Sequence, residues 1–176
     1  WDGGSIQIQA SAHEADVAAR WVRSLATRIA GYRRLPLHVI GEERVSGANS
    51  CLSPGDLGAI DLLEGVCEHG PAVLAVTDVG ALRACLAQAL SIPQAEELWS
   101  SLLARARRAG VVIVAAYCGR FTSSTAAMGA FSMRLVRARD ADEALHAGIQ
   151  PSSLRSLGEA HALLARPGEE TALACV

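Results

Sequence analysis

The sequence predicts an α/β protein with a mainly parallel sheet and helices on both of its faces. Two apolar runs carry this prediction, one over 71–78 (Pro-Ala-Val-Leu-Ala-Val-Thr-Asp) and one over 110–118 (Gly-Val-Val-Ile-Val-Ala-Ala-Tyr-Cys). Each run opens at Gly or Pro and ends in polar residues, as do strands that are buried on both faces of a parallel sheet. The residues between the runs have helical periodicity, and 51% of the chain is apolar, which is typical of a helix-rich α/β domain.

The length of 176 residues suits one domain, so we expect a single α/β domain over 1–176. Residues 35–176 form its predicted core. The strand and helix of residues 1–34 are either part of that core or an appendage to it. The chain opens on Trp1 rather than Met, which raises the alternative that it is a piece of something longer.

The first part of the chain contains a predicted strand and a long helix. Residues 5–10 alternate apolar and polar side chains, which predicts a half-exposed or edge strand. The helix begins at Ser11 or His13 and runs to about Ala30, with Gly31 as its C-cap.

The other elements follow from local patterns along the chain. Pro36 makes the run 35–40 an edge strand or the start of a strand, and the turn-rich residues 41–54 are predicted to be a loop. The remaining predictions are helices over 56–68 (with Ser53 as N-cap), 80–90, 94–109 and 140–147, a strand over 131–138, and a C-terminal β-hairpin of 161–165 and 171–176.

All sixteen basic residues are arginine, because the chain contains no lysine. Without an ammonium group, a Schiff base and a phosphate-loop lysine are both excluded.

The net charge of −2 creates no field that attracts nucleic acid or an anionic membrane, so we expect neither partner. No apolar run approaches the ~18 residues of a membrane span, and no signal peptide is expected. Five scattered cysteines without C-x-x-C spacing predict reduced cytosolic thiols and no metal site.

Polar residues follow both buried strands, and the carboxyl ends of parallel strands meet at the edge where open α/β sheets place their ligands. Thr77 and Asp78 end the first strand, and the residues Tyr-Cys-Gly-Arg of 117–120 end the second. One hypothesis from the residues alone is a small cytosolic enzyme with its site at Asp78, Cys118 and the hydroxyls of 122–125, in which Cys118 is the nucleophile. The alternative for Cys118 is a buried structural cysteine.

The order of segments from residue 71 onward resembles that of a known family. The segments are 74–78 (Leu-Ala-Val-Thr-Asp), 103–111, 115–120 (Ala-Ala-Tyr-Cys-Gly-Arg), 131–136 and 157–164. Together they resemble the second half of the RecA-like motor domain in the FtsK/SpoIIIE family, which includes the type VII secretion ATPases of the EccC/EssC group. Residues 3–9 resemble the last strand of a preceding module.

The resemblance implies a RecA-like P-loop NTPase architecture with nucleotide-binding positions at Asp78, Arg120 and Thr122. It implies neighbouring ATPase modules, secretion-complex proteins or a substrate peptide as partners, and a cytoplasmic location that can lie within a membrane-associated complex. Arg120 is either a residue lent to a neighbour's nucleotide or a solvated loop arginine.

The chain departs from the family at the positions of the residues that bind and hydrolyse the nucleotide. The nearest candidate phosphate loop, 41–50, has one residue too many between its glycines and Ala48 where lysine belongs. Thr77 replaces the magnesium-orienting aspartate, and Tyr117 or Cys118 stands at a glutamine-like position. We therefore expect a degenerate, non-hydrolysing module without a working phosphate loop, for which ATP and Mg²⁺ are vestigial ligands and no other cofactor is needed. Its expected role is protein interaction or regulation in a secretion or translocation ATPase.

Overall fold

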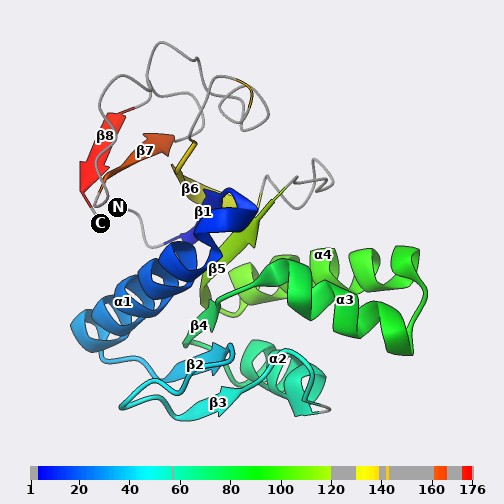
Figure 1. Ribbon diagram of the computed structural model, residues 1–176. Helices are drawn as coiled ribbons and strands as arrows, with labels where there is room; N and C mark the ends of the chain where they lie inside the picture. The colour runs from blue at the N-terminus through cyan, green and yellow to red at the C-terminus, as the bar shows by residue number, and fades with distance from the viewer. Residues whose placement is uncertain are drawn as a thin grey trace.

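The computed structural model describes residues 4–56, 58–119, 130–138, 142, 161–165 and 172–175. Eight strands in this part of the chain form one sheet in the order β3-β2-β4-β5-β1-β6-β7-β8 (Figure 1). The strands are β1 (Ser5–Ala10), β2 (Leu37–Ile40), β3 (Ser50–Leu52), β4 (Val73–Val76), β5 (Val112–Cys118), β6 (Phe131–Val136), β7 (His161–Ala165) and β8 (Ala172–Cys175). The helices are the 3-10 turn η1 (Ala12–Glu14) and the α-helices α1 (Ala15–Arg33), α2 (Gly58–His69), α3 (Val79–Ala89) and α4 (Ile92–Arg108).

The sheet is parallel from β3 through β6, and β7 and β8 join it as an antiparallel hairpin. The two apolar runs are the neighbouring strands β4 and β5, with Val73 opposite Val112 and Val76 opposite Ala115. The predicted α/β class, the adjacency of these two strands and the C-terminal β-hairpin are all confirmed.

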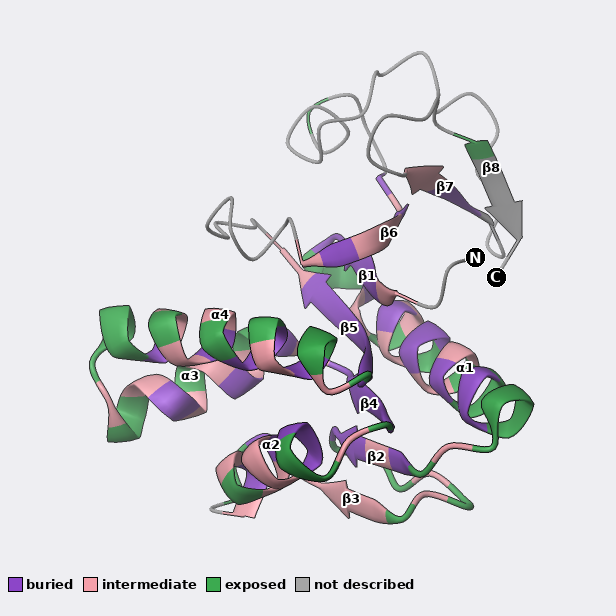
Figure 2. Cartoon of the chain, turned by 180° about the vertical axis from the view of Figure 1, so that it is seen from behind, coloured by how far each residue is buried: buried purple, intermediate pink, exposed green. Residues whose placement is uncertain are grey.

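Helices cover both faces of the sheet, as predicted (Figure 1). α1 packs on one face, and α2, α3 and α4 pack on the other. Because side chains alternate across a strand, successive residues of β4 and β5 belong to the two different cores. The core under α1 includes Ile8, Trp21, Val22, Val39 and Val114, and the opposite core includes Leu63, Leu74, Leu82, Trp99 and Ile113. Figure 2 shows the buried central strands between these two layers.

Side-chain caps fix the starts of α3 and α4. The Asp78 carboxylate accepts a hydrogen bond from the Ala81 amide at the first turn of α3. Ser91 and Gln94 form a reciprocal capping box at α4, with Pro93 in the first turn where its missing N–H is not needed. Leu90 and Ser91 thus separate the two helices, and an Arg83–Glu96 ion pair joins these helices as a hairpin.

The prediction of an edge strand at 5–10 is wrong. β1 lies between β5 and β6, near the middle of the sheet, and Gln7 is completely buried. Alternation misled the interpretation because Ile6 and Ile8 face the α1 core while Gln7 and Gln9 are buried on the opposite face. Residues 4–34 therefore contribute a central strand and the helix that covers it, rather than an appendage. α1 ends at Arg33, and its C-cap is Arg34 in a left-handed conformation (φ 56°) rather than Gly31.

Three further boundaries differ from the predictions. β2 is an inner strand that begins after Pro36, so the strand-start interpretation of Pro36 is confirmed and the edge interpretation is wrong. The predicted loop 41–54 contains the edge strand β3. Ser53 belongs to a turn closed by Asp56 rather than capping α2, which begins at Gly58. The predicted helix at 140–147 lies outside the described residues, except for Asp142.

None of the helices in the described ranges is long and apolar enough to cross a membrane.

Candidate functional site at the carboxyl edge

The carboxyl ends of β4, β5, β1 and β6 come together at one edge of the sheet. Ala10 at the end of β1 is opposite Cys118 of β5, and Gln9 is opposite Val136 of β6. Two backbone hydrogen bonds continue these pairings past the strand ends, from Gly119 N to the Ala10 carbonyl and from the Arg137 amide to the Gln9 carbonyl. The ends of β4 and β5 lie side by side, with Val76 opposite Ala115, as predicted for the residues that follow them; Arg120 lies outside the described residues.

At the end of β4, both polar side chains are bound by the protein itself. Thr77 is buried, and its hydroxyl donates to the Ile40 carbonyl over 3.4 Å. Asp78, the predicted remnant of the acidic strand end, accepts the Ala81 amide at 3.0 Å as the N-cap of α3. The structure thus places Asp78 at the edge, where it stabilises the start of a helix.

At the end of β5, Tyr117 turns into the core instead of toward the edge. The buried Trp99 indole donates a hydrogen bond of 3.0 Å to the Tyr117 hydroxyl, and the Tyr117 ring meets Phe131 edge-on at 5.9 Å. Burial raises the pKa of Tyr117 to about 12. Tyr117 is therefore a packing residue, with its hydroxyl in the core rather than at the edge.

Cys118 has the opposite electrostatics from an activated nucleophile. Burial first, and then the nearby Asp78 carboxylate, raise the pKa of the Cys118 thiol to about 11. Reactive cysteines have a lowered pKa, because the thiolate is the attacking species. The thiol of Cys118 is protonated at neutral pH, so the geometry does not favour the small-enzyme hypothesis.

The position of a phosphate loop in this topology is the turn between β1 and α1. Such a loop joins a strand to a helix, and its glycine amides and lysine hold the phosphates. Here residues 11–15 read Ser-Ala-His-Glu-Ala, with neither glycine nor lysine. The segment 41–50 joins the strands β2 and β3 without a helix, so it is not in this position. Sequence reasoning missed the β1–α1 turn because it placed β1 at an edge.

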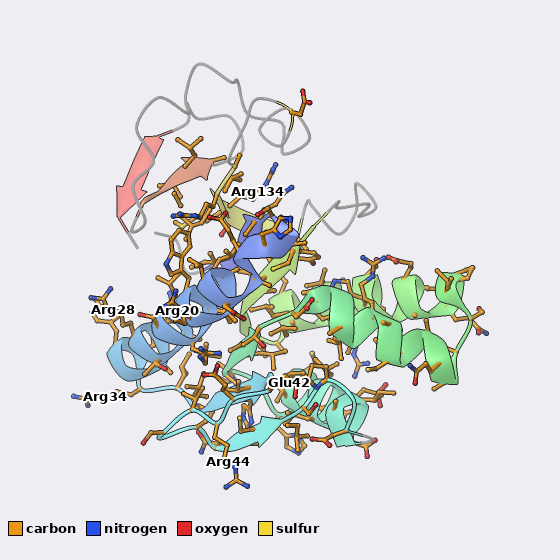
Figure 3. All side chains as sticks on the ribbon, in the orientation of Figure 1. Arg20, Arg28, Arg34, Glu42, Arg44 and Arg134 are labelled. Atoms are coloured by element: carbon orange, nitrogen blue, oxygen red, sulfur yellow. The ribbon has the colours of Figure 1, made fainter. Side chains whose placement is uncertain are left out.

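Glu14 and Arg137 form a buried ion pair at this turn. The Arg137 Nε lies 2.6 Å from Glu14 Oε1, and the two side chains are only 14% and 8% exposed. Arg137 follows β6, while Glu14 immediately precedes α1, so the pair links residues 123 positions apart. By contrast, the exposed Arg28, Arg34 and Arg44 point away from the body of the protein (Figure 3).

Arg134 is a second half-buried arginine beside this region, on β6 (Figure 3). Its guanidinium donates to the Gln9 amide oxygen over 3.4 Å, and burial lowers the pKa of Arg134. The other two predicted nucleotide-binding residues, Arg120 and Thr122, lie outside the described residues. Within the described ranges, no three His, Cys, Asp or Glu side chains are grouped as a metal site.

The strand order, the helices on both faces and the strand–turn–helix unit at β1 define a RecA-like P-loop NTPase fold. No protein-family model and no curated protein sequence matches the chain. Among solved structures, the chain is similar to EssC (ATPases 2 and 3) from Geobacillus thermodenitrificans, with a TM-score of 0.68 and 12% identity over 98% of this chain and 39% of that one.

The fold is also that of two further proteins. The cytoplasmic domain of the type VII secretion ATPase EccC from Thermomonospora curvata matches with a TM-score of 0.66 and 12% identity, over 98% of this chain and 25% of that one. A second EccC structure, of ATPases 2 and 3, holds a signal sequence peptide. The genome packaging NTPase of Sulfolobus turreted icosahedral virus 2, in complex with ATP-gammaS, matches at 0.64 and 9% identity over 98% of both chains.

The chain thus spans 25% and 39% of the two secretion ATPases but nearly all of the viral NTPase. The fold expected from the FtsK/SpoIIIE resemblance is confirmed.

Proposed function

We propose that this chain is a non-hydrolysing RecA-like module that acts through protein contacts, as an interaction or regulatory domain of a secretion or translocation ATPase. The observation that carries the proposal is the β1–α1 turn. Where a phosphate loop presents glycine amides and a lysine, this turn presents the buried Glu14 carboxylate, and the chain has no lysine at all.

The rest of the edge supports the same conclusion. Magnesium in a P-loop NTPase is held by a loop hydroxyl and an acidic residue at the strand end. Here the candidate acidic residue Asp78 caps α3, and Thr77 beside it is bonded to the Ile40 carbonyl. Both side chains at the end of β4 are thus engaged by the protein itself, which supports a role that does not depend on a Mg²⁺–phosphate complex.

The similarity in fold to ATPase modules guides the choice of partner. EccC and EssC contain ATPases 2 and 3 in one chain, and one EccC structure includes a signal sequence peptide. We therefore propose a neighbouring ATPase module as the first partner and a substrate peptide as the second, in the cytoplasm, either alone or within a membrane-associated complex.

ATP turnover tests the proposal in two arms. The chain alone should release no phosphate from Mg-ATP above a buffer blank. Mixed with a complete EccC-type motor chain, it should change the turnover of that motor, because a regulatory module acts on its neighbour. Robust turnover by the isolated chain would contradict the non-hydrolysing role. An unchanged motor rate, with no complex on size-exclusion chromatography, would contradict the regulatory role.

A further inference from the structure

The amino end of α1 carries a negative side chain that does not cap the helix. Glu14 is the residue immediately before this 19-residue helix, and its side chain makes no hydrogen bond to the backbone of the first turn. The free amides and the dipole make this end of a helix attractive to anions. The Glu14 carboxylate supplies an anion at this end, with 7% of the residue exposed.

The cation of the pair comes from a different part of the sheet, and it contacts at least three of the residues that the structure describes. The Arg137 amide donates to the Gln9 carbonyl at 2.8 Å, which places Arg137 beside the end of β1. Its Nε meets the Glu14 carboxylate, and its guanidinium carbon lies 5.8 Å from the centre of the Trp21 ring on α1. The pair therefore joins β6 to the β1–α1 turn and to the helix that covers β1.

A buried hydroxyl lies in the same turn. Ser11 is 8% exposed, and its Oγ has no hydrogen-bond partner in the part of the chain that the structure describes. Buried hydroxyls ordinarily have a partner. A helix amino end, an arginine and a hydroxyl are together the donors that a tetrahedral oxyanion accepts from.

We infer that Glu14 is an internal ligand of Arg137: its carboxylate occupies this arginine at the β1–α1 turn and keeps external phosphate out. The inference rests on the proposed function, since it explains how the fold is held together without nucleotide. It also identifies the class of ligand that the vacated turn would accept, which is free inorganic phosphate or sulfate. The internal pair keeps the module in one state, whether or not ATP is present around it.

Removal of the carboxylate provides the test. Glu14→Ala should unfold at a lower temperature than the wild type in chloride. Phosphate or sulfate at constant ionic strength should raise its melting temperature by about 3 °C, the shift expected for a ligand at roughly ten times its Kd in a domain of this size. The wild type should show no such rise, and Glu14→Ala/Arg137→Met should show none either, because the cation that receives the anion is gone.

Glu43→Ala is the matched control. Glu43 also pairs with an arginine, Arg23 at 3.0 Å, but its side chain is 70% exposed and it is not at a helix amino end. This variant should be insensitive to phosphate. If Glu14→Ala is unfolded in chloride, phosphate should restore its circular dichroism transition.

Two results overturn the inference: a Glu14→Ala variant that responds to phosphate no more than Glu43→Ala does, or a wild type that responds equally. The proposed function fails differently, through ATP turnover by the wild-type chain. A wild type inert to ATP, together with a Glu14→Ala variant inert to phosphate, removes only the internal-ligand inference.

Discussion

At the scale of single residues, three polar side chains of the carboxyl edge are bound to the protein itself. Asp78 bonds to the first turn of α3, Thr77 bonds to the end of β2, and Glu14 bonds to Arg137. Buried polar groups are costly unless they have partners, so these contacts stabilise the edge as a closed structure. The predictions at this scale concern how tightly the edge is packed and how its thiol behaves.

Gly41 is required by the close approach of β2 and β4. A Cβ at this position would lie 2.4 Å from the Thr77 Oγ1 and 2.9 Å from its Cγ2. We expect Gly41→Ala to lower the free energy of unfolding by about 1–3 kcal/mol, as overpacking does. Urea denaturation measures this loss, and Gly41→Ala/Thr77→Ala should recover part of it.

Gly31→Ala serves as the control for that substitution. Gly31 lies in α1, and an added Cβ would meet no atom within 4 Å. Alanine should therefore stabilise the helix, by roughly 0.5–1 kcal/mol. A Gly41→Ala variant as stable as the wild type would contradict the tight contact with Thr77.

Cys118 should react slowly with iodoacetamide at neutral pH. A pKa raised from 9.0 to about 11 leaves about 100-fold less thiolate than an ordinary cysteine has at the same pH. Mass spectrometry of the Cys118 peptide measures the rate, with the urea-unfolded chain as the reference. Rapid labelling of folded Cys118, at or above the unfolded rate, would restore the small-enzyme hypothesis.

At the scale of elements, the α3–α4 hairpin is locked to β5 by one buried hydrogen bond. Trp99 of α4 is 1% exposed, and its indole N–H donates to Tyr117 of β5. The same tyrosine ring contacts Phe131 of β6. Two neighbouring strands and a helix thus share one aromatic cluster, made of Trp99, Tyr117 and Phe131.

Tyr117→Phe should destabilise the protein although it removes only one oxygen atom. The Trp99 N–H would be left buried without its acceptor, at a cost of about 1–3 kcal/mol. Adding Trp99→Phe to this variant should cost less than the sum of the two single changes. Tyr32→Phe is the control, because Tyr32 is 90% exposed. Additive losses in urea denaturation would argue against the bond.

The same tyrosine makes stability depend on alkaline pH. Its pKa is about 12 in the folded protein, against 10.0 for an unperturbed tyrosine, so the folded state keeps the phenol proton to higher pH. The resulting stability is complete below pH 10 and is lost as the pH rises through about 12. Unfolding free energies of the wild type should therefore fall more steeply with pH above about 10 than those of Tyr117→Phe. Parallel pH profiles would contradict the burial of the phenol.

Much of this fold could be predicted from local patterns, and the errors have a physical cause. β4 and β5 are apolar on both faces, so their sequence alone marks them as inner strands. β1 is equally central but carries Gln7 and Gln9, and buried polar residues give the same alternation as a half-exposed strand. β3 has only three residues, which is too few to show an alternation of apolar and polar side chains. Its sequence therefore could not be distinguished from that of the surrounding loop.

The candidate site was predictable only in part. Asp78 follows a recognisable strand end, so its place at the carboxyl edge could be read from the sequence. Glu14 could not be recognised in the same way, because its role depends on Arg137, 123 residues away, and on the pairing of β1 with β6. The one local signal was an acidic residue directly between a strand and a long helix, where a phosphate loop would have glycine and lysine.

At the scale of the whole molecule, the chain keeps the RecA-like fold while the β1–α1 turn holds the Glu14–Arg137 ion pair. The two sides of the sheet each have an extensive core, so the architecture does not need a ligand to hold it together. The proposed role uses contacts with neighbouring modules rather than the chemistry of ATP. The central claim is therefore that the carboxyl edge is closed to nucleotide.

Calorimetric titration of Mg-ATP into the isolated wild-type chain tests this claim most directly. A complete P-loop NTPase domain, titrated with Mg-ATP in the same buffer, is the positive control for binding. The account predicts no heat beyond dilution for the wild type, because the β1–α1 turn carries the Glu14 carboxylate, which repels phosphate, and no lysine is present to receive the nucleotide. Saturable one-to-one binding of Mg-ATP, lost in an Arg137→Met variant that remains folded, would contradict it.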